Sequence, residues 1–334
     1  MTLTTLRFNQ VTPGLDRREV SARYRATVEM AAFADAHGFD LVTLEEHHGA
    51  DDGWSPSPLS TAAAVFGATR RIGVIVCALL TPLYEPLRLA EDVAVLDHLS
   101  GGRLTLVAGL GYRPEEYTAL GKDWAQRGRL QDEVLETLLK AWTGEPFDHH
   151  GRTVRITPPP LTRPHPGLMV GGSSRVAVRR AVRLRLPFFT AAYLPDLVDL
   201  YDALAAEAGF EGGFASLPPE RTAMIHCTED PDKAWAEYGD CFLHEARTYA
   251  GWQTADVSSA MASTAATAEE LRAEGIYACL TPDECLEVAR SEGPLGTLLL
   301  HPLCGGLPVD AGWESLRLFA DQVVPRLGGE PPSA

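Results

Sequence analysis

The amino-acid sequence predicts an α/β protein of the (β/α)8 TIM-barrel class with insertions. Short apolar segments that suit strands alternate along the 334 residues with segments that suit helices, and no linker interrupts them. No Gly-x-Gly-x-x-Gly follows the first predicted strand, which disfavours the alternative of a doubly wound open sheet. With 45% hydrophobic residues the chain can build a sizeable core. We therefore expect one domain over residues 1–328 and a frayed tail over 329–334.

In the first half of the chain, cap and turn residues separate four predicted strands from four predicted helices. Gly38 suits the end of the first helix, because a left-handed cap carries no steric cost at glycine. Ser57 and Pro58 suit the N-cap and first turn of the second helix. Residues 72–80 form a continuous apolar run typical of a strand buried on both faces. The predicted strands are 3–11, 40–48, 72–80 and 103–109, and the predicted helices are 21–37, 59–69, 86–100 and 128–142.

The second half continues the alternation around two irregular stretches. Residues 147–166 are proline-rich and form an excursion rather than a linker, because a strand pattern resumes at 168–170. Residues 254–268 are rich in Ala, Ser and Thr, and we expect a mobile insertion or lid over about 250–275. The other predicted strands are 188–192, 221–227 and 297–301, and the predicted helices are 176–184, 194–208, 232–249, 269–290 and 313–324.

Composition and charge exclude several classes of partner. The net charge of −16 disfavours a nucleic-acid or anionic-membrane surface, since both need basic footprints. No apolar run approaches the ~18 residues of a membrane span, and no signal peptide is expected at the N-terminus. The six cysteines are scattered without a CxxC, which indicates buried thiols in a reduced compartment. We expect a cytoplasmic protein.

The predicted strand 40–48 ends in two carboxylates and two imidazoles, which is the sharpest local signal in the chain. Side chains on a strand alternate between its faces, so Val42 and Leu44 share the outward face of a barrel. Glu45 and His47 then look inward, towards a pocket at the barrel mouth. Parity therefore favours His47 over His48 as the acid/base, although both could instead be hydrogen-bonded loop histidines.

A collinear series of short segments, rather than one motif, runs over about residues 3–326. The segments are Glu46-His47-His48, Gly67-Ala-Thr69, Pro86 to Arg88, Ala90-Glu-Asp-Val93, Leu96-Asp97, Ser100-Gly-Gly-Arg103, Gly109-Leu-Gly111, Glu115-Glu-Tyr117, Val170-Gly-Gly-Ser-Ser174 and Trp313-Glu-Ser-Leu316. In these segments the chain resembles the bacterial luciferase-like flavin monooxygenase family.

The resemblance implies a TIM barrel that binds a flavin at the carboxyl ends of its strands, with His47 near the ring as a catalytic acid/base. A non-prolyl cis peptide often ends the third strand beneath the flavin in this family, and the corresponding bond here joins Cys77 and Ala78. The resemblance further implies reduced FMN from a separate flavin reductase, O2, a small organic substrate, and a homodimer formed through the helices after the second and third strands.

Luciferase itself carries a reactive cysteine where this chain has Gly109, and an arginine where it has Leu110. Light emission from a long-chain aldehyde is therefore not expected. The glycines at 109 and 111 suggest close approach of the backbone to a ligand, and Arg113 is a candidate for a charge role nearby.

The remaining candidates are ambiguous from the residues alone. Glu45 is expected to orient His47, or else to be an inward structural carboxylate. Tyr112 and Tyr117 are expected to line the flavin or substrate pocket, although Tyr117 suits helix packing equally well. Gly171-Gly172-Ser173-Ser174 is a simple turn with a cap or, in the family's register, a phosphate cradle to which Arg175 adds charge. His301 is a weaker candidate at the end of the last strand.

Three other functions remain open. A deazaflavin (F420)-dependent oxidoreductase has the same fold, but residues 180–189 lack the Asp-Gly-Trp run common in those relatives, which favours FMN. A barrel metallohydrolase using His47 and His48 is disfavoured, because adjacent strand residues diverge. The last alternative is a non-catalytic flavin-binding protein.

Overall fold

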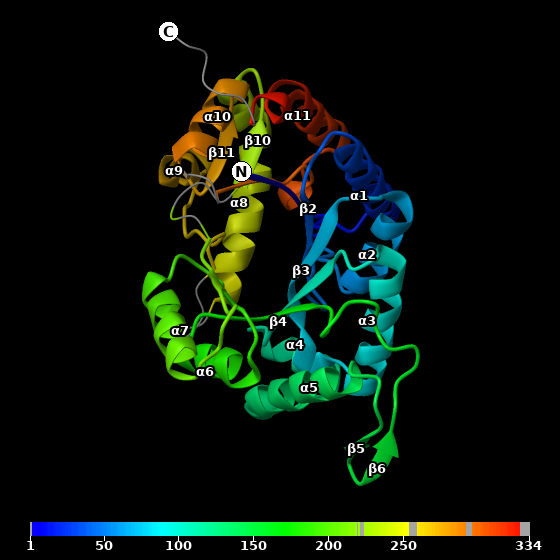
Figure 1. Cartoon of the computed structure of the whole chain (residues 1–334). Helices are drawn as coiled ribbons and strands as arrows, with labels where there is room; N and C mark the ends of the chain where they lie inside the picture. Colours follow the sequence, from blue (N-terminus) through cyan, green and yellow to red (C-terminus); the bar gives the residue numbers. More distant parts are fainter. Residues whose placement is uncertain (1, 219, 221–223, 254–258, 292–295, 328–334) are drawn as a thin grey trace.

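The computed structural model describes residues 2–218, 220, 224–253, 259–291 and 296–327. Ten strands form one curved sheet with helices packed around it, and a separate two-stranded hairpin projects from the body (Figure 1). The strands of the sheet are β1 (Leu3–Phe8), β2 (Leu41–Leu44), β3 (Gly73–Leu80), β4 (Leu104–Gly109), β7 (Gly167–Gly172), β8 (Phe188–Thr190), β9 (Ala215–Ser216), β10 (Met224–Cys227), β11 (Tyr277–Leu280) and β12 (Thr297–Leu300).

Helices follow most of these strands, so the predicted alternation is confirmed. The helices are α1 (Arg17–Ala36), α2 (Pro58–Ala68), α3 (Pro86–Ser100), α4 (Pro114–Ala119), α5 (Arg127–Ala141), α6 (Arg175–Leu184), α7 (Pro195–Glu207), α8 (Pro231–Trp252), α9 (Ala268–Glu274), α10 (Pro282–Ser291) and α11 (Val309–Gln322). Short 3-10 turns lie at Thr81–Leu83, Trp124–Gln126, Cys304–Gly306 and Val324–Arg326. Among the described helices none is long and apolar enough to cross a membrane.

The strands pair in parallel in the order β11-β10-β12-β1-β2-β3-β4-β7-β8-β9. Their carboxyl ends therefore lie at one edge of the sheet, where α/β enzymes carry their sites. The predicted fold class, an α/β barrel with insertions, is confirmed. That residues 1–328 form a single domain stays a prediction, and 329–334 lie outside the described residues.

One predicted helix was wrong. Residues 269–290 form two helices with the strand β11 between them. Gly275 adopts a left-handed cap that ends α9, and Pro282 starts α10, so the four residues of β11 are free to pair with β10. A second difference is smaller. The side chain of Asp16 accepts hydrogen bonds from the backbone N–H groups of Arg18 and Glu19, so α1 begins four residues earlier than expected.

The two predicted insertions differ in form. The excursion over 147–166 contains the antiparallel hairpin of β5 (Phe147–His149) and β6 (Arg152–Val154). The segment that follows this hairpin is attached to α3, because Asp97 on that helix accepts hydrogen bonds from the backbone N–H (2.7 Å) and the hydroxyl (2.8 Å) of Thr162. The predicted lid over 250–275 includes the end of α8 and all of α9, while 254–258 lie outside the described residues. Its mobility stays a prediction.

Packing confirms the parity assigned to β2. Val42 and Leu44 are buried in the main hydrophobic core, on the side covered by helices. The opposite side faces the interior of the barrel, where charged residues gather instead: Arg7, Glu45 and Glu245 are all buried.

Candidate active site

His47 lies just beyond the carboxyl end of β2 and is only 5% exposed. Its Nδ1 is 2.9 Å from Oε1 of Glu116, and its Nε2 is 3.0 Å from the hydroxyl of Tyr112. Burial, followed by the charges of Glu45 and Glu116, raises the pKa of Tyr112 well above its usual range, so the phenol keeps its proton. The pattern that satisfies all three groups has Nδ1 donating to Glu116 and Nε2 accepting from Tyr112. Nε2 is then the basic atom of the site.

Glu116, on α4, is a residue of this site that sequence reasoning missed. Besides the bond with His47, its Oε1 accepts hydrogen bonds from the backbone N–H of His48 at 3.0 Å and from Nη1 of Arg113 at 3.3 Å. Burial alone would raise the pKa of this carboxyl, but the hydrogen bond from His47, the backbone hydrogen bond from His48 and the charge of Arg113 lower it instead. Glu116 is therefore an ionised carboxylate that fixes the orientation of the imidazole.

The prediction that Glu45 orients His47 was wrong. Glu45 forms an ion pair with Nε of Arg7 on the neighbouring strand β1, and its Oε2 accepts the hydroxyl of Tyr249 at 2.8 Å. Both contacts lie inside the barrel, so the alternative of an inward structural carboxylate is the one that the structure supports.

The two histidines of the pair have different partners. Nε2 of His48 is 3.0 Å from Oε1 of Glu46, on the other side of the strand. Burial lowers the pKa of His48, but the hydrogen bond and charge of Glu46 outweigh it, so the net shift is upward. Glu46 also accepts the backbone N–H of Leu80 and the hydroxyl of Tyr84, each at 2.6 Å. This second carboxylate therefore holds the end of β3, while Glu116 holds the imidazole of His47.

Three aromatic rings cover His47. The ring centroids of Trp54, Tyr112 and Trp252 lie 5.3, 5.2 and 4.7 Å from that of the imidazole. Trp252 is the last residue of α8, and the guanidinium of Arg113 lies 4.4 Å from the centre of its ring. The same guanidinium donates to the carbonyl of His48 at 2.9 Å, so Arg113 connects the end of α8 to the segment after β2 that carries His47 and His48.

Buried charges attach α8 to the barrel. Glu245 is 3.1 Å from Nη1 of Arg7, and its Oε2 accepts from Asn9 and from the backbone N–H of Gly305, both at 2.9 Å. Burial opposes this charge, but His301 and Arg7 outweigh it and hold the pKa of Glu245 well below its usual range. Glu245, Tyr249 and Trp252 stand at i, i+4 and i+7, so one face of α8 carries all three towards the mouth of the barrel.

The peptide bond between Cys77 and Ala78 is cis, as the resemblance implied. It lies at an irregularity in the pairing of β3 with β4, beside Gly109. Burial and the nearby charge of Glu45 raise the pKa of the Cys77 thiol to about 12, so the thiol stays protonated. A side chain at Gly109 would bring its Cβ within 2.7 Å of the Cβ of Ala78. Close packing against Ala78 thus accounts for the glycine where luciferase carries its reactive cysteine.

Replacing Gly109 with alanine is expected to destabilise the protein by ~1–3 kcal/mol, the usual cost of overpacking a core position. The measurement is the free energy of unfolding in urea. Gly67→Ala is the matched control, because a Cβ there meets nothing within 4 Å and Gly67 lies within α2. Alanine should raise stability there by up to ~1 kcal/mol. Equal effects of the two substitutions would contradict the close packing at Gly109.

The segment from Gly171 to Ser174 joins the end of β7 to the start of α6. A Cβ added at Gly171 would lie 2.8 Å from the side chain of Val107, and one added at Gly172 would lie 2.8 Å from that of Ala177. Both glycines therefore allow close packing of strand and helix. The hydroxyl of Ser174 accepts the backbone N–H of Ala177 at 3.3 Å and caps the helix. Ser173 is half-buried in the same turn. The predicted turn with a cap is confirmed, and the phosphate cradle stays a prediction.

Three further candidates lie away from His47 or have structural roles. The hydroxyl of Tyr117 donates to the carbonyl of Leu110 at 2.5 Å, and the ring is buried against Trp124, which is the packing role that the sequence left open. Gly111 has a positive φ of 72° that suits glycine. His301 lies beside Glu245, 3.2 Å from its Oε2, and not beside His47.

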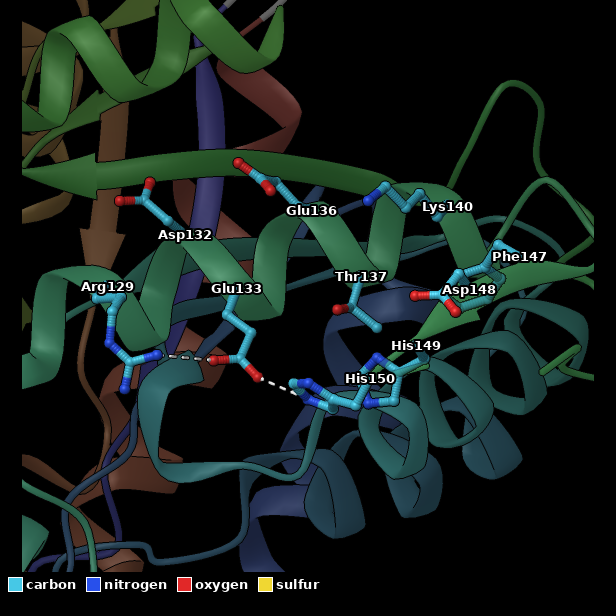
Figure 2. A pocket seen from close by; sticks show the side chains of 10 residues that line it. All are labelled: Arg129, Asp132, Glu133, Glu136, Thr137, Lys140, Phe147, Asp148, His149 and His150. Atoms are coloured by element: carbon cyan, nitrogen blue, oxygen red, sulfur yellow. Dashed lines mark hydrogen bonds and ion pairs between the residues drawn. The ribbon is translucent and has the colours of Figure 1, made fainter. Parts of the chain in front are cut away.

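A cavity of about 290 Å³ lies between α5 and the β5–β6 hairpin, away from the residues above. Figure 2 shows that charged side chains line it, among them Arg129, Glu133 and His150. Arg129 and His150 both pair with Glu133, at 3.5 and 3.1 Å. Because these side chains are largely exposed and already pair with one another, the His47 site remains the candidate active site.

Comparison with known proteins shows which family and which folds the chain resembles. Residues 1–287 match the family model described as luciferase-like monooxygenase. The chain is 30% identical over 219 residues to an FMNH2-dependent dimethylsulfone monooxygenase of Pseudomonas putida, a match that covers 62% of this chain and 60% of that protein. It superimposes on the monooxygenase RslO1 of Streptomyces bottropensis with a TM-score of 0.78 at 24% identity, covering 97% of this chain and 99% of the other.

The oxygenating component of 3,6-diketocamphane monooxygenase of Pseudomonas putida, solved in complex with FMN, superimposes with a TM-score of 0.71 at 21% identity. The match covers 97% of this chain and 98% of that one. These structural likenesses support the fold.

Proposed function

The chain belongs to the luciferase-like monooxygenase family, and from that premise we propose that it is a two-component monooxygenase. In this proposal it takes reduced FMN from a separate flavin reductase and uses O2 to oxidise a small organic substrate. The observation that carries the proposal is the His47–Glu116 pair at the carboxyl ends of the strands, together with the cis bond of Cys77 and Ala78 near the carboxyl end of β3. The names of the relatives, one FMNH2-dependent and one solved with FMN, support the choice of flavin.

Two features of the site fit such a cofactor. Oε2 of Glu116 is buried and has no hydrogen-bond partner among the described residues, so it suits an N–H donor from a bound ring. At the other end of the site, α6 begins with a capped N-terminus, and Arg175 and Arg179 are exposed on its first two turns. A helix N-terminus and exposed guanidinium groups both favour a phosphate. The residues that would hold FMN are thus Gly171–Ser174 with Arg175 and Arg179 at the phosphate, and Cys77–Ala78, Gly111 and Tyr112 at the ring.

Reduced FMN, when bound, would supply the electrons that activate O2. The chain's own contribution is a proton-transfer group held in one orientation. Nε2 of His47 would accept a proton from the bound substrate once the hydroxyl of Tyr112 moves aside, and the carboxylate of Glu116 would stabilise the resulting imidazolium through Nδ1. The rings of Trp54 and Trp252 exclude water from that atom.

Titration of the protein with reduced FMN and with reduced F420, under anaerobic conditions, tests the cofactor. Reduced FMN is expected to quench the intrinsic tryptophan fluorescence, because Trp54 and Trp252 lie at the site. Tight binding of F420 with no binding of FMN would overturn the proposal in favour of the deazaflavin alternative.

The double substitution Arg175→Gln and Arg179→Gln is expected to weaken FMN binding about tenfold, the loss of one charge-assisted hydrogen bond. Riboflavin, which lacks the phosphate, should bind the variant and the native protein alike. Arg183→Gln is the control, because Arg183 lies on the same helix but is already paired with Asp132 and Glu136. If riboflavin binding falls as much as FMN binding, the phosphate does not lie at α6.

We also propose the homodimer that the resemblance implied, formed through α2 and α3. Val95 and Leu99 are exposed on one face of α3, which is where an apolar contact between copies would bury them. A cytoplasmic location stays a prediction.

A further inference from the structure

We propose that His244 on α8 and Asp52 in the loop after β2 form a pH-dependent clasp that positions this loop over His47. Residues 49–57 are called the covering segment below. The inference rests on the proposed function, because it concerns access to the acid/base of that site. His244 is a positioning residue in this proposal, since it acts through the covering segment and does not touch the reacting atoms.

The first observation is that the covering segment folds back over His47. The carbonyl of Ser55 accepts the backbone N–H of His47 at 3.0 Å. The ring of Trp54 meets the imidazole edge to face, with the centroids 5.3 Å apart. The placing of the indole over His47 therefore depends on where the covering segment is held.

The second observation is that two kinds of contact hold the covering segment. Backbone hydrogen bonds attach it to the end of β1 and the residues that follow, where Ser55 donates to the carbonyl of Asn9 at 2.8 Å and Thr12 donates to the carbonyl of Asp52 at 2.6 Å. An ion pair attaches it to α8, where Nε2 of His244 lies 3.0 Å from Oδ2 of Asp52. The ion pair thus adds a link to α8 that the backbone hydrogen bonds do not supply.

The third observation is that the two partners differ in burial. The side chain of Asp52 is 10% exposed, and its Oδ1 is buried without a hydrogen-bond partner among the described residues. The side chain of His244 is 37% exposed and lines a cavity of about 470 Å³ on one face of α8. A buried carboxylate is unfavourable without a charged or hydrogen-bonding partner, so Asp52 depends on His244, which can exchange its proton with solvent.

The charged groups that face His244 are Asp52 from the covering segment and, from α8 itself, Asp240, Glu245 and Arg247. The hydrogen bond with Asp52 raises the pKa of His244, burial opposes the rise, and the charges of Asp52 and Glu245 add to it. The clasp therefore contributes fully below the unfolded pKa of ~6.5 and is lost as pH rises through the higher folded pKa. The covering segment should be held more firmly at pH 5.5 than at pH 9.

Hydrogen–deuterium exchange of the full chain, followed by mass spectrometry of peptides that span residues 49–57, tests the proposal. Exchange rates are converted to protection factors, which removes the intrinsic dependence of amide exchange on pH. The protection factor of the covering segment is expected to fall about fivefold between pH 5.5 and pH 9, the loss of one charge-assisted hydrogen bond at a partly exposed site. Peptides from α5 should keep their protection factors.

Substitutions of His244 separate its charge from its hydrogen bond. His244→Gln keeps a hydrogen-bond donor but has no charge, so its covering segment should show one protection factor at both pH values, close to that of the native protein at pH 9. His244→Lys carries a cation throughout and should keep the high protection factor at both. Adding Asp52→Asn to His244→Gln should cause no further loss, because the ionic contact is already absent. His149→Gln, the same exchange on the β5–β6 hairpin, is the matched control and should behave as the native protein does.

Two results would overturn the clasp. The first is a native protection factor that does not change between pH 5.5 and pH 9. The second is a fall that persists in His244→Gln, which would come from His47 or His48 instead, since both remain in that variant. Because the measurement uses neither flavin nor substrate, its failure is distinguishable from a failure of FMN to bind.

Discussion

Replacing His47 with alanine is expected to lower turnover by about 10²–10⁴-fold, the usual contribution of a positioned acid/base. The reason is that Nε2 of His47 is the basic atom held by the Glu116 carboxylate at the mouth of the barrel. The measurement is product formation with reduced FMN, O2 and a substrate that the native protein turns over. FMN affinity should change little, because the phosphate is assigned to α6.

His149→Ala is the matched control, since His149 lies on the β5–β6 hairpin away from the site. Glu116→Gln should also lower turnover, by less than His47→Ala, because an amide still accepts from Nδ1 but no longer stabilises the imidazolium. The pH dependence of the rate should shift in Glu116→Gln, which loss of stability alone would not produce. Unchanged turnover in His47→Ala would remove the assigned role and favour the alternative of a non-catalytic flavin-binding protein.

Replacing Arg7 with methionine is expected to destabilise the protein by ~3–5 kcal/mol, the usual cost of breaking a buried ion pair. Arg7 is 3% exposed and lies between the carboxylates of Glu45 and Glu245, and its loss would leave both of them buried without the guanidinium. Burial opposes the charge of the guanidinium, but Glu45, Tyr249 and Glu245 outweigh it and raise its pKa well above the usual value. The free energy of unfolding in urea measures the effect.

Arg183→Met provides the control for Arg7→Met. Arg183 is half-exposed and pairs with Asp132 and Glu136 at 2.6 Å, so its loss should cost under ~1 kcal/mol. Adding Glu45→Gln to Arg7→Met should recover part of the stability by removing one uncompensated charge. Equal costs for the two arginines would contradict the view that buried charges attach α8 to the barrel.

Lowering the pH should reduce the stability that Glu245 contributes through its contacts with Arg7 and its other buried partners. The pKa of Glu245 is held well below its usual range in the folded protein, so Glu245 contributes stability above its unfolded pKa of ~4.3 and loses it as pH falls towards the folded pKa. Glu245→Gln is therefore expected to cost stability at pH 7 and progressively less below pH ~4. A difference between the two proteins that stays constant from pH 7 to pH 3 would show that the charge of Glu245 is not the source.

Local sequence signals were enough to predict the fold and to single out His47, one member of the His47–Glu116 pair. Alternation of side chains along the strand places His47 and His48 on opposite faces, and the face of a side chain depends only on its position along the strand. The cis bond at Cys77 came from the family's register rather than from any local pattern. Strand β11 was missed because its four residues lie between two helical segments whose composition dominates the stretch.

The partners of His47 could not be predicted, because they come from distant parts of the chain. Glu116 is 69 residues away, on a short helix that had no signal apart from Pro114 and the acidic residues of its first turn. The same holds for Arg7 and Glu245, which are 238 residues apart and meet through the contact of α8 with β1. Long-range pairing of this kind follows from tertiary structure. The sequence therefore pointed to Glu45, the near neighbour, as the carboxylate that orients His47, whereas Glu116 makes that contact in the structure.

A crystal structure of the chain with FMN tests most directly whether the His47 site is a flavin site. The result expected is a flavin ring over the Cys77–Ala78 peptide, within reach of Nε2 of His47, with the phosphate at Gly171–Ser174. A flavin bound elsewhere, for example in the cavity between α5 and the hairpin, with His47 still covered by Tyr112 and Trp252, would contradict it.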